Sequence, residues 1–150
     1  MEVSFTPLLE SDLQSLDEQR TWVREHYDIE ARHRYETIDG KLYLLQTILA
    51  QNWIAPEETW KLQSLGVTLG DALSQRMAMF WCIVKDEYGR DPALQLEGMD
   101  KFKDVIVFPL TTISKRVERG EVVDIQELFE ELCDMVLEKK QARSDPKPSS

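Results

Sequence analysis

The densest group of chemically active side chains lies near the middle of the chain. Segment 85–92 contains the polar residues Asp86, Glu87, Tyr88, Arg90 and Asp91. Three carboxylates in one turn could hold a hard cation such as calcium. An EF-hand loop, however, needs ligands at alternate positions and a distal bidentate glutamate, which this segment lacks. We therefore expect a solvated turn here and no metal site.

A second polar group is basic. Lys115, Arg116 and Arg119 lie close together in a segment with helical spacing. They could receive a carboxylate or phosphate group, or form an internal ion pair with the acidic turn. Cations near the C-terminal end of a helix also complement the helix dipole, which is the simplest explanation. All three interpretations stay open from the sequence.

Nucleophilic and metal chemistry have little support in the sequence. His26 and His33 have no serine or cysteine placed near them by a recognisable nucleophile motif. Cys82 and Cys133 lie far apart and show no zinc-ligand spacing, so we expect two buried free thiols. The sequence indicates no cofactor.

Three tryptophans stand in apolar surroundings. Trp53, Trp60 and Trp81 could line an aromatic pocket. Large aromatic side chains on apolar stripes are usually part of a core, however. We therefore expect these rings to be core residues, with the pocket as the alternative.

Composition and charge restrict the classes of partner. The chain has 150 residues, 42% of them hydrophobic, and a formal net charge of −10. This charge disfavours nucleic acid and anionic membranes, because binding to phosphates depends on lysine and arginine. It fits a basic protein partner, or solubility alone. The start of the chain lacks the pattern of a signal peptide, so we expect a cytoplasmic protein.

Apolar residues at helical spacing predict helices in the first half of the chain. The first begins at Thr6-Pro7, or at Ser11 with a capping box to Gln14, and ends near Tyr27. Residues 28–34 form a connection. A second helix is expected over residues 35–53, where the helical pattern is clearest after Gly40. A third is expected over residues 55–76. In the last of these, Gly66 and Gly70 lie four residues apart and would let another segment approach closely.

The residue pattern in the second half of the chain predicts strands followed by helices. Residues 77–84 form a buried strand that enters a hairpin at 85–92. Residues 93–98 form a strand with Gln95 and Glu97 on its solvent-exposed face. After a turn at Met99-Asp100, a third strand covers 103–109, which completes an antiparallel meander. A short helix then starts at Thr111 or Thr112 and ends at Gly120. A longer one runs from Asp124, in a capping box with Glu127, to Lys139-Lys140.

The predicted fold class is therefore α+β. N-terminal helices precede a three-stranded antiparallel meander, and two C-terminal helices pack on the sheet. We expect a single domain over residues 1–141 and a flexible tail over 142–150, which is rich in Ser, Pro and Lys.

Three ordered blocks of sequence resemble a bacterial family, domain of unknown function 3806 (DUF3806). The blocks are residues 62–73, 81–94 and 105–129, and the resemblance covers roughly 40–130. It implies no activity, cofactor or partner. Residues of this chain that match the family's signature positions are Trp81, Asp86, Gly89, Arg90, Asp91, Lys115 and Arg116. The resemblance thus adds interest to a surface formed by the hairpin and the basic helix.

Our leading hypothesis is a non-enzymatic module that binds a basic protein, for example as an immunity protein neutralises a toxin. The alternative is a small-molecule-binding protein or small enzyme with a cleft between sheet and helices, using Asp86, Arg90, Asp91 and Lys115. A purely structural role, in which the hairpin carboxylates pair with Lys115 and Arg116, also stays open. The sequence gives no oligomeric state.

Overall fold

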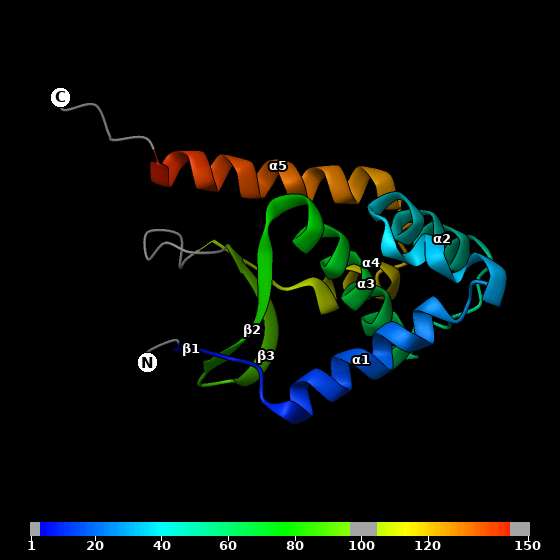
Figure 1. Cartoon of the computed structure of the whole chain (residues 1–150), viewed down its shortest axis with the longest axis horizontal. Helices are drawn as coiled ribbons and strands as arrows, with labels where there is room; N and C mark the ends of the chain where they lie inside the picture. Colours follow the sequence, from blue (N-terminus) through cyan, green and yellow to red (C-terminus); the bar gives the residue numbers. More distant parts are fainter. Residues whose placement is uncertain (1–3, 97–104, 145–150) are drawn as a thin grey trace.

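The protein consists of a small sheet with helices gathered beside it. The computed structural model of the protein describes residues 4–96 and 105–144. In chain order its elements are β1 (Ser4–Thr6), α1 (Glu10–Arg24), the 3-10 helix η1 (Ile29–Glu36), α2 (Ile38–Ala50), α3 (Thr59–Met77), β2 (Met79–Asp86), β3 (Gly89–Leu96), β4 (Ile106–Val107), α4 (Pro109–Glu118) and α5 (Ile125–Ser144). Figure 1 shows α3 and α4 beside the sheet and α2 on the far side of α3 from the strands. The predicted α+β class is confirmed.

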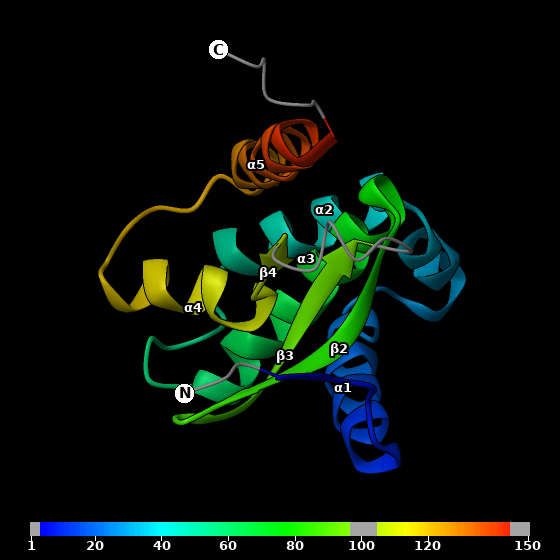
Figure 2. The same cartoon turned by 90° about the vertical axis from the view of Figure 1, so that its left-hand side faces the viewer.

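The sheet is antiparallel, with the strand order β1-β2-β3-β4. β2 and β3 form the predicted hairpin, in register from Asp86 opposite Gly89 to Met79 opposite Leu96. The turn itself is confined to residues 87–88, so that β3 begins at Gly89 and not at residue 93 as predicted. Figure 2 shows this hairpin as the largest part of the sheet.

The sequence predicts three strands, and the described residues form four. β1 is the additional strand, and it pairs with β2 through Phe5 opposite Val84. A strand of three residues is too short to show an alternating pattern, which explains why the sequence did not reveal it. The predicted third strand is present as β4, whereas the predicted turn at Met99-Asp100 lies outside the described residues.

The faces of β3 differ from the prediction at one position. Leu94 and Leu96 belong to the main core, as expected. Gln95, which was predicted to be solvent-exposed, is only 7% exposed. Its cross-strand neighbours are Phe80 on β2 and Ile106 on β4. β3 is therefore an inner strand of the sheet at this position, with a neighbouring strand on each side of Gln95. Glu97 is outside the described residues.

Helix α3 is the centre of the fold. It contacts α1, α2, α4, α5, β2 and β3, and its middle residues 64–70 are buried on all sides. Gly66 and Gly70 allow the predicted close approach. A Cβ atom on Gly66 would lie 2.6 Å from the Cα of Leu110, and one on Gly70 would lie 2.7 Å from the ring of Trp81.

The first helices are shorter than predicted. α1 starts at Glu10, and its first turn is closed by Asp12, which accepts a hydrogen bond from the Leu9 N–H, in place of the predicted Ser11–Gln14 box. α2 starts at Ile38, where the hydroxyl of Thr37 accepts a bond from the N–H of Gly40. The preceding turns up to Glu36 are the 3-10 helix η1, which occupies the predicted connection.

The two C-terminal helices begin and end with clear signals. α4 starts at Pro109 and not at Thr111 or Thr112, because proline suits the first turn, where N–H groups have no helical partner. Gly120, with φ +76°, ends it as predicted. Asp124 caps α5 by accepting a bond from the Glu127 N–H. α5 continues past Lys139-Lys140 to Ser144, so the first part of the predicted tail is helical.

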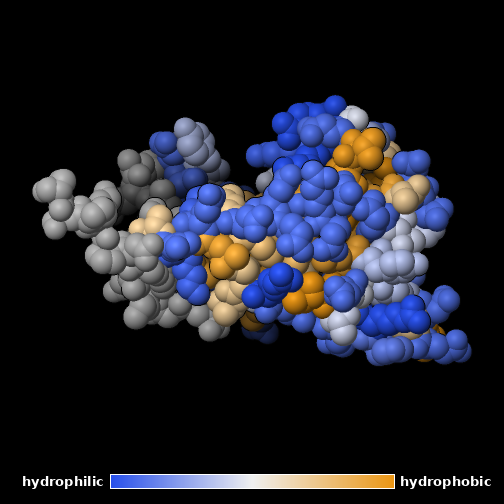
Figure 3. Space-filling model, turned by 90° about the horizontal axis from the view of Figure 1, so that it is seen from above, coloured by the Kyte–Doolittle hydropathy of each residue, from blue (hydrophilic) through white to orange (hydrophobic). Residues whose placement is uncertain are grey.

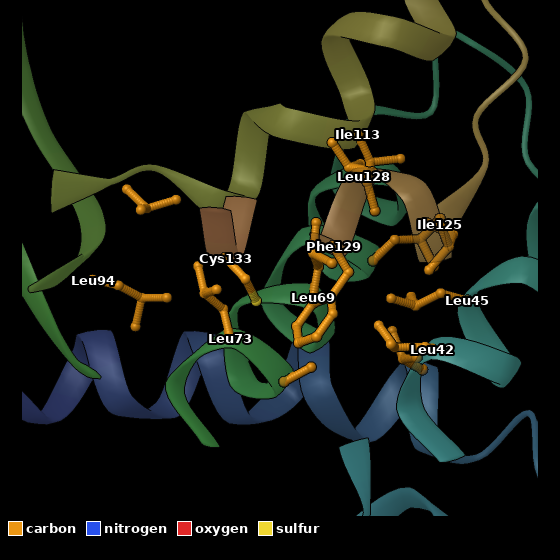
Figure 4. Close-up of a cluster of buried hydrophobic side chains, with 14 of the residues drawn as sticks. Leu42, Leu45, Leu69, Leu73, Leu94, Ile113, Ile125, Leu128, Phe129 and Cys133 are labelled. Atoms are coloured by element: carbon orange, nitrogen blue, oxygen red, sulfur yellow. The ribbon is translucent and has the colours of Figure 1, made fainter. Parts of the chain in front are cut away.

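Side chains from four helices and β3 meet in the main core. Figure 4 shows them pointing toward one another around Phe129: Leu42, Leu45, Leu69, Leu73, Leu94, Ile113, Ile125, Leu128 and Cys133. Seen from above, the face that includes α5 is largely hydrophilic, with hydrophobic patches between the polar residues (Figure 3). None of the described helices is both long and apolar enough to span a lipid bilayer.

Candidate functional site

One carboxylate of the acidic hairpin shapes the turn, and the other two are exposed. One carboxylate oxygen of Asp86 accepts a hydrogen bond of 2.8 Å from the backbone N–H of Tyr88. Aspartate at the start of a turn commonly makes this local bond. The side chains of Glu87 and Asp91 are exposed, and Tyr88 is 88% exposed. The hairpin thus presents one aromatic ring and two carboxylates to solvent.

Arg90 is bound to the start of α1. Its two terminal nitrogens donate hydrogen bonds of 3.1 and 3.0 Å to the two carboxylate oxygens of Asp12. The hydrogen bond from Arg90 holds the pKa of Asp12 below its usual value. This pair therefore fastens the hairpin to α1, and the guanidinium is not a free group for a ligand.

The basic residues of α4 make local contacts. Arg116 donates to the carbonyl of Thr112 at 2.8 Å, and Arg119 donates to the carbonyl of Lys115 at 3.1 Å. Arg119 also pairs with Glu121 at 3.0 Å. Among the described residues, no hydrogen bond or ion pair links these cations to the hairpin carboxylates. The local bonds at the end of α4 agree with a role beside the negative end of the helix dipole.

Trp81 takes part in a polar network that the sequence did not predict. Its indole N–H donates to one carboxylate oxygen of Asp71 at 3.0 Å. The same carboxylate accepts two bonds from Arg20, of 2.5 and 3.0 Å. Burial alone would lower the pKa of Arg20, but its bonds to Asp71 outweigh this effect and raise it. The network joins α1, α3 and β2 and fixes the ring of Trp81.

Four rings form what we call the aromatic surface: Trp22, His26, Trp53 and Trp60. Trp22 packs edge-on against His26 at 4.6 Å and against Trp60 at 5.9 Å between ring centroids. His26 stacks on Trp53 at 5.9 Å. Trp53 is 53% exposed and Trp60 is 48% exposed. The prediction that both tryptophans belong to the core is therefore wrong, and the third predicted ring, Trp81, lies elsewhere.

The aromatic surface has acidic neighbours. Glu18 is exposed on α1 and Glu25 directly after it, each within one turn of Trp22, and Glu57 is exposed just before α3. Lys61 lies 6.0 Å from the ring of Trp22, and its charge is offset by Glu58 at 2.6 Å. The surface around the rings therefore has an excess of negative charge.

The sequence profile described as domain of unknown function (DUF3806) matches residues 41–129. The chain belongs to the DUF3806 family. The matched range includes the hairpin, α3, α4 and the start of α5, but not α1. Two rings of the aromatic surface, Trp22 on α1 and His26 just after it, thus lie outside the DUF3806 match.

A crystal structure of a protein from Bacteroides thetaiotaomicron VPI-5482 has a similar fold. The TM-score is 0.68 at 17% sequence identity, and the match covers 89% of this chain and 48% of the other. The DUF3806 chain thus spans about half the length of that protein. At this identity the likeness concerns the fold alone. Curated proteins give no match.

Proposed function

We propose that this DUF3806 domain is a protein-interaction module that contacts its partner through the aromatic surface. The observation that supports the proposal is the exposure of Trp53 and Trp60, at 53% and 48%, beside two further rings. Tryptophan is enriched among the few residues that dominate binding energy at protein interfaces. Rings that are already packed against one another also lose little side-chain freedom when a partner covers them.

The partner that fits this surface is a basic protein. The chain has a net charge of −10, and Glu18, Glu25 and Glu57 are exposed near the rings. Opposite charges on two surfaces accelerate association and favour one partner over others. Neutralisation of a basic toxin by an immunity protein is one function of this kind, and cytoplasmic residence is part of the same proposal.

A small-molecule site at the hairpin has weaker support. That alternative uses Asp86, Arg90, Asp91 and Lys115 as binding groups. Asp86 instead closes its own turn, and Arg90 is bound to Asp12. Two of the four proposed binding groups, Asp86 and Arg90, therefore already have hydrogen-bond partners within the chain.

The test begins with the purified domain as bait in a lysate of the organism that encodes it, at low and at high salt. A recovered protein is then purified and its affinity measured by calorimetry. We expect a basic protein whose binding weakens with salt. The double variant Trp53→Ala/Trp60→Ala should weaken binding about 30-fold or more, because the loss of even one hot-spot residue costs roughly 2 kcal/mol or more.

Tyr88→Ala is the matched control. Tyr88 is an exposed aromatic residue of the hairpin, outside the aromatic surface. Its removal should leave the affinity unchanged. If Tyr88→Ala abolishes binding and the tryptophan variant does not, the hairpin is the interface and the aromatic surface is not. If the domain recovers no specific partner at either salt concentration, the interaction function itself is contradicted.

A further inference from the structure

Lys41 is a buried lysine with few partners. It lies on α2 and is only 5% exposed. Its Nζ donates one hydrogen bond of 2.6 Å, to the neutral Oε1 of Gln75, and lies 4.9 Å from the ring of Tyr35. An ammonium group has three donors, so two of them have no hydrogen-bond partner among the described residues. Within that part of the chain no carboxylate lies at ion-pair distance.

This arrangement is unusual, because buried charges in proteins are normally paired. The attraction between an ammonium and an aromatic ring offsets only part of the lost hydration. Burial lowers the pKa of Lys41, while the carboxylates of Asp71 and Glu36, which lie farther away, act in the opposite direction. A lysine held in this way costs stability unless a further group binds it.

Lys41 lines a pocket of about 310 Å³ together with residues of α1, η1 and α3. Arg24 lines the same pocket, and within residues 4–96 and 105–144 its one side-chain hydrogen bond, at 3.2 Å, goes to the neutral hydroxyl of Thr21. Arg20 is also in the wall, but it is bound to Asp71. Two cations without carboxylate partners among the described residues, Lys41 and Arg24, thus face one concave space.

The wall also limits the kind of anion. Asp71 and the exposed Glu36 line the pocket, so it holds three cations and two carboxylates. A doubly charged phosphate would meet repulsion from both carboxylates. A singly charged carboxylate suits the small positive excess, and arginine and lysine both bind carboxylates through charge-assisted hydrogen bonds. The volume is at the lower end of the range for ligand pockets.

We propose that this pocket binds a small molecule with one carboxylate group, which accepts hydrogen bonds from Lys41 and Arg24. The site is separate from the aromatic surface and from the hairpin. It adds a ligand-binding function to the proposed protein interaction and does not depend on it.

The test is an NMR titration of the ¹⁵N-labelled full chain with sodium acetate, at ionic strength held constant with sodium chloride. We expect saturable shifts that centre on the amides of residues 40–41 and 74–75. Lys41→Met keeps the length and apolar stem of the side chain and removes its charge. It should weaken acetate binding about 10-fold or more, because a hydrogen bond to a charged group is lost.

Lys115→Met is the matched control, since Lys115 is exposed on α4 and the change in net charge is identical. It should leave the acetate affinity unchanged. Lys41→Met should also melt at the same temperature as the wild type or higher, because it removes an incompletely paired buried charge. Absence of saturable shifts in the wild type, or equal affinity in Lys41→Met, would overturn the site. Tighter binding of inorganic phosphate, titrated in the same way, would overturn the carboxylate assignment.

Discussion

The contact between Gly70 and the Trp81 ring allows a quantitative prediction. A Cβ atom at position 70 would lie 2.7 Å from Cζ2 and Cη2 of the ring and 2.9 Å from Cγ of Pro109. The ring cannot swing away freely, because its N–H is bound to Asp71. Overpacking of this kind costs about 1–3 kcal/mol, and the better helix propensity of alanine returns up to about 1 kcal/mol. We expect Gly70→Ala to lower the free energy of unfolding by about 1–2 kcal/mol.

A double-mutant cycle separates this clash from other effects. Trp81→Phe removes the two ring atoms that a Cβ at position 70 would meet. In that background Gly70→Ala should cost about 1 kcal/mol less than in the wild type. The assay is urea unfolding followed by far-ultraviolet circular dichroism, which does not depend on the tryptophan signal.

Gly66→Ala serves as the control in the same cycle. A Cβ atom there would meet the backbone of Pro109 and Leu110 rather than the Trp81 ring. Its cost should therefore be the same with Trp81 or Phe at position 81. A Gly70→Ala variant as stable as the wild type would refute the reasoning, as would equal coupling of both glycines to Trp81→Phe.

Further predictions concern three other features of the fold. Asp12→Asn should lower stability near neutral pH, because the bond from Arg90 lowers the pKa of Asp12 and thus favours folding only while the carboxylate is ionised. The difference from wild type should shrink as the pH falls through that lowered pKa, which urea unfolding across the acid range will check. Ala78→Gly should raise stability by up to about 1 kcal/mol in thermal melts, because Ala78 ends α3 with φ +53°, a conformation that glycine adopts without strain. Cys82 and Cys133 are buried, and burial raises the pKa of both thiols, so a disulfide reagent should react fully only in denaturant; rapid reaction of the native protein would contradict their placement.

Much of the fold could be predicted because its signals are local. The hairpin around residues 85–92, the end of α4 at Gly120 and the cap of α5 at Asp124 depend on residues a few positions apart. The two glycines of α3 also indicated close packing, although not against which segment. β1 gave no signal, because three residues cannot show a period and its pairing with β2 spans more than half of the chain.

The candidate sites were harder to predict, for a physical reason. Trp53 and Trp60 are types usually found in cores, and their exposure depends on which helices reach them in the folded chain. Asp71 binds Arg20 from 51 positions away, and Lys41 binds Gln75 from 34 positions away. No spacing rule indicates such pairs. The hairpin residues, by contrast, stood out because they are adjacent, yet Asp86 and Arg90 form hydrogen bonds within the chain.

Helix α1 also shows that the recognised sequence segment and the folding unit differ. The DUF3806 match covers residues 41–129, whereas Arg20 and the fully buried Val23 lie before it. A chain trimmed to the matched range would leave Asp71 without its arginine and uncover the side of α3 on which α1 lies. It would also lose β1 and open the edge of β2, and an open strand edge promotes association between molecules. A domain boundary drawn from sequence similarity alone would thus cut through a network that the fold needs intact.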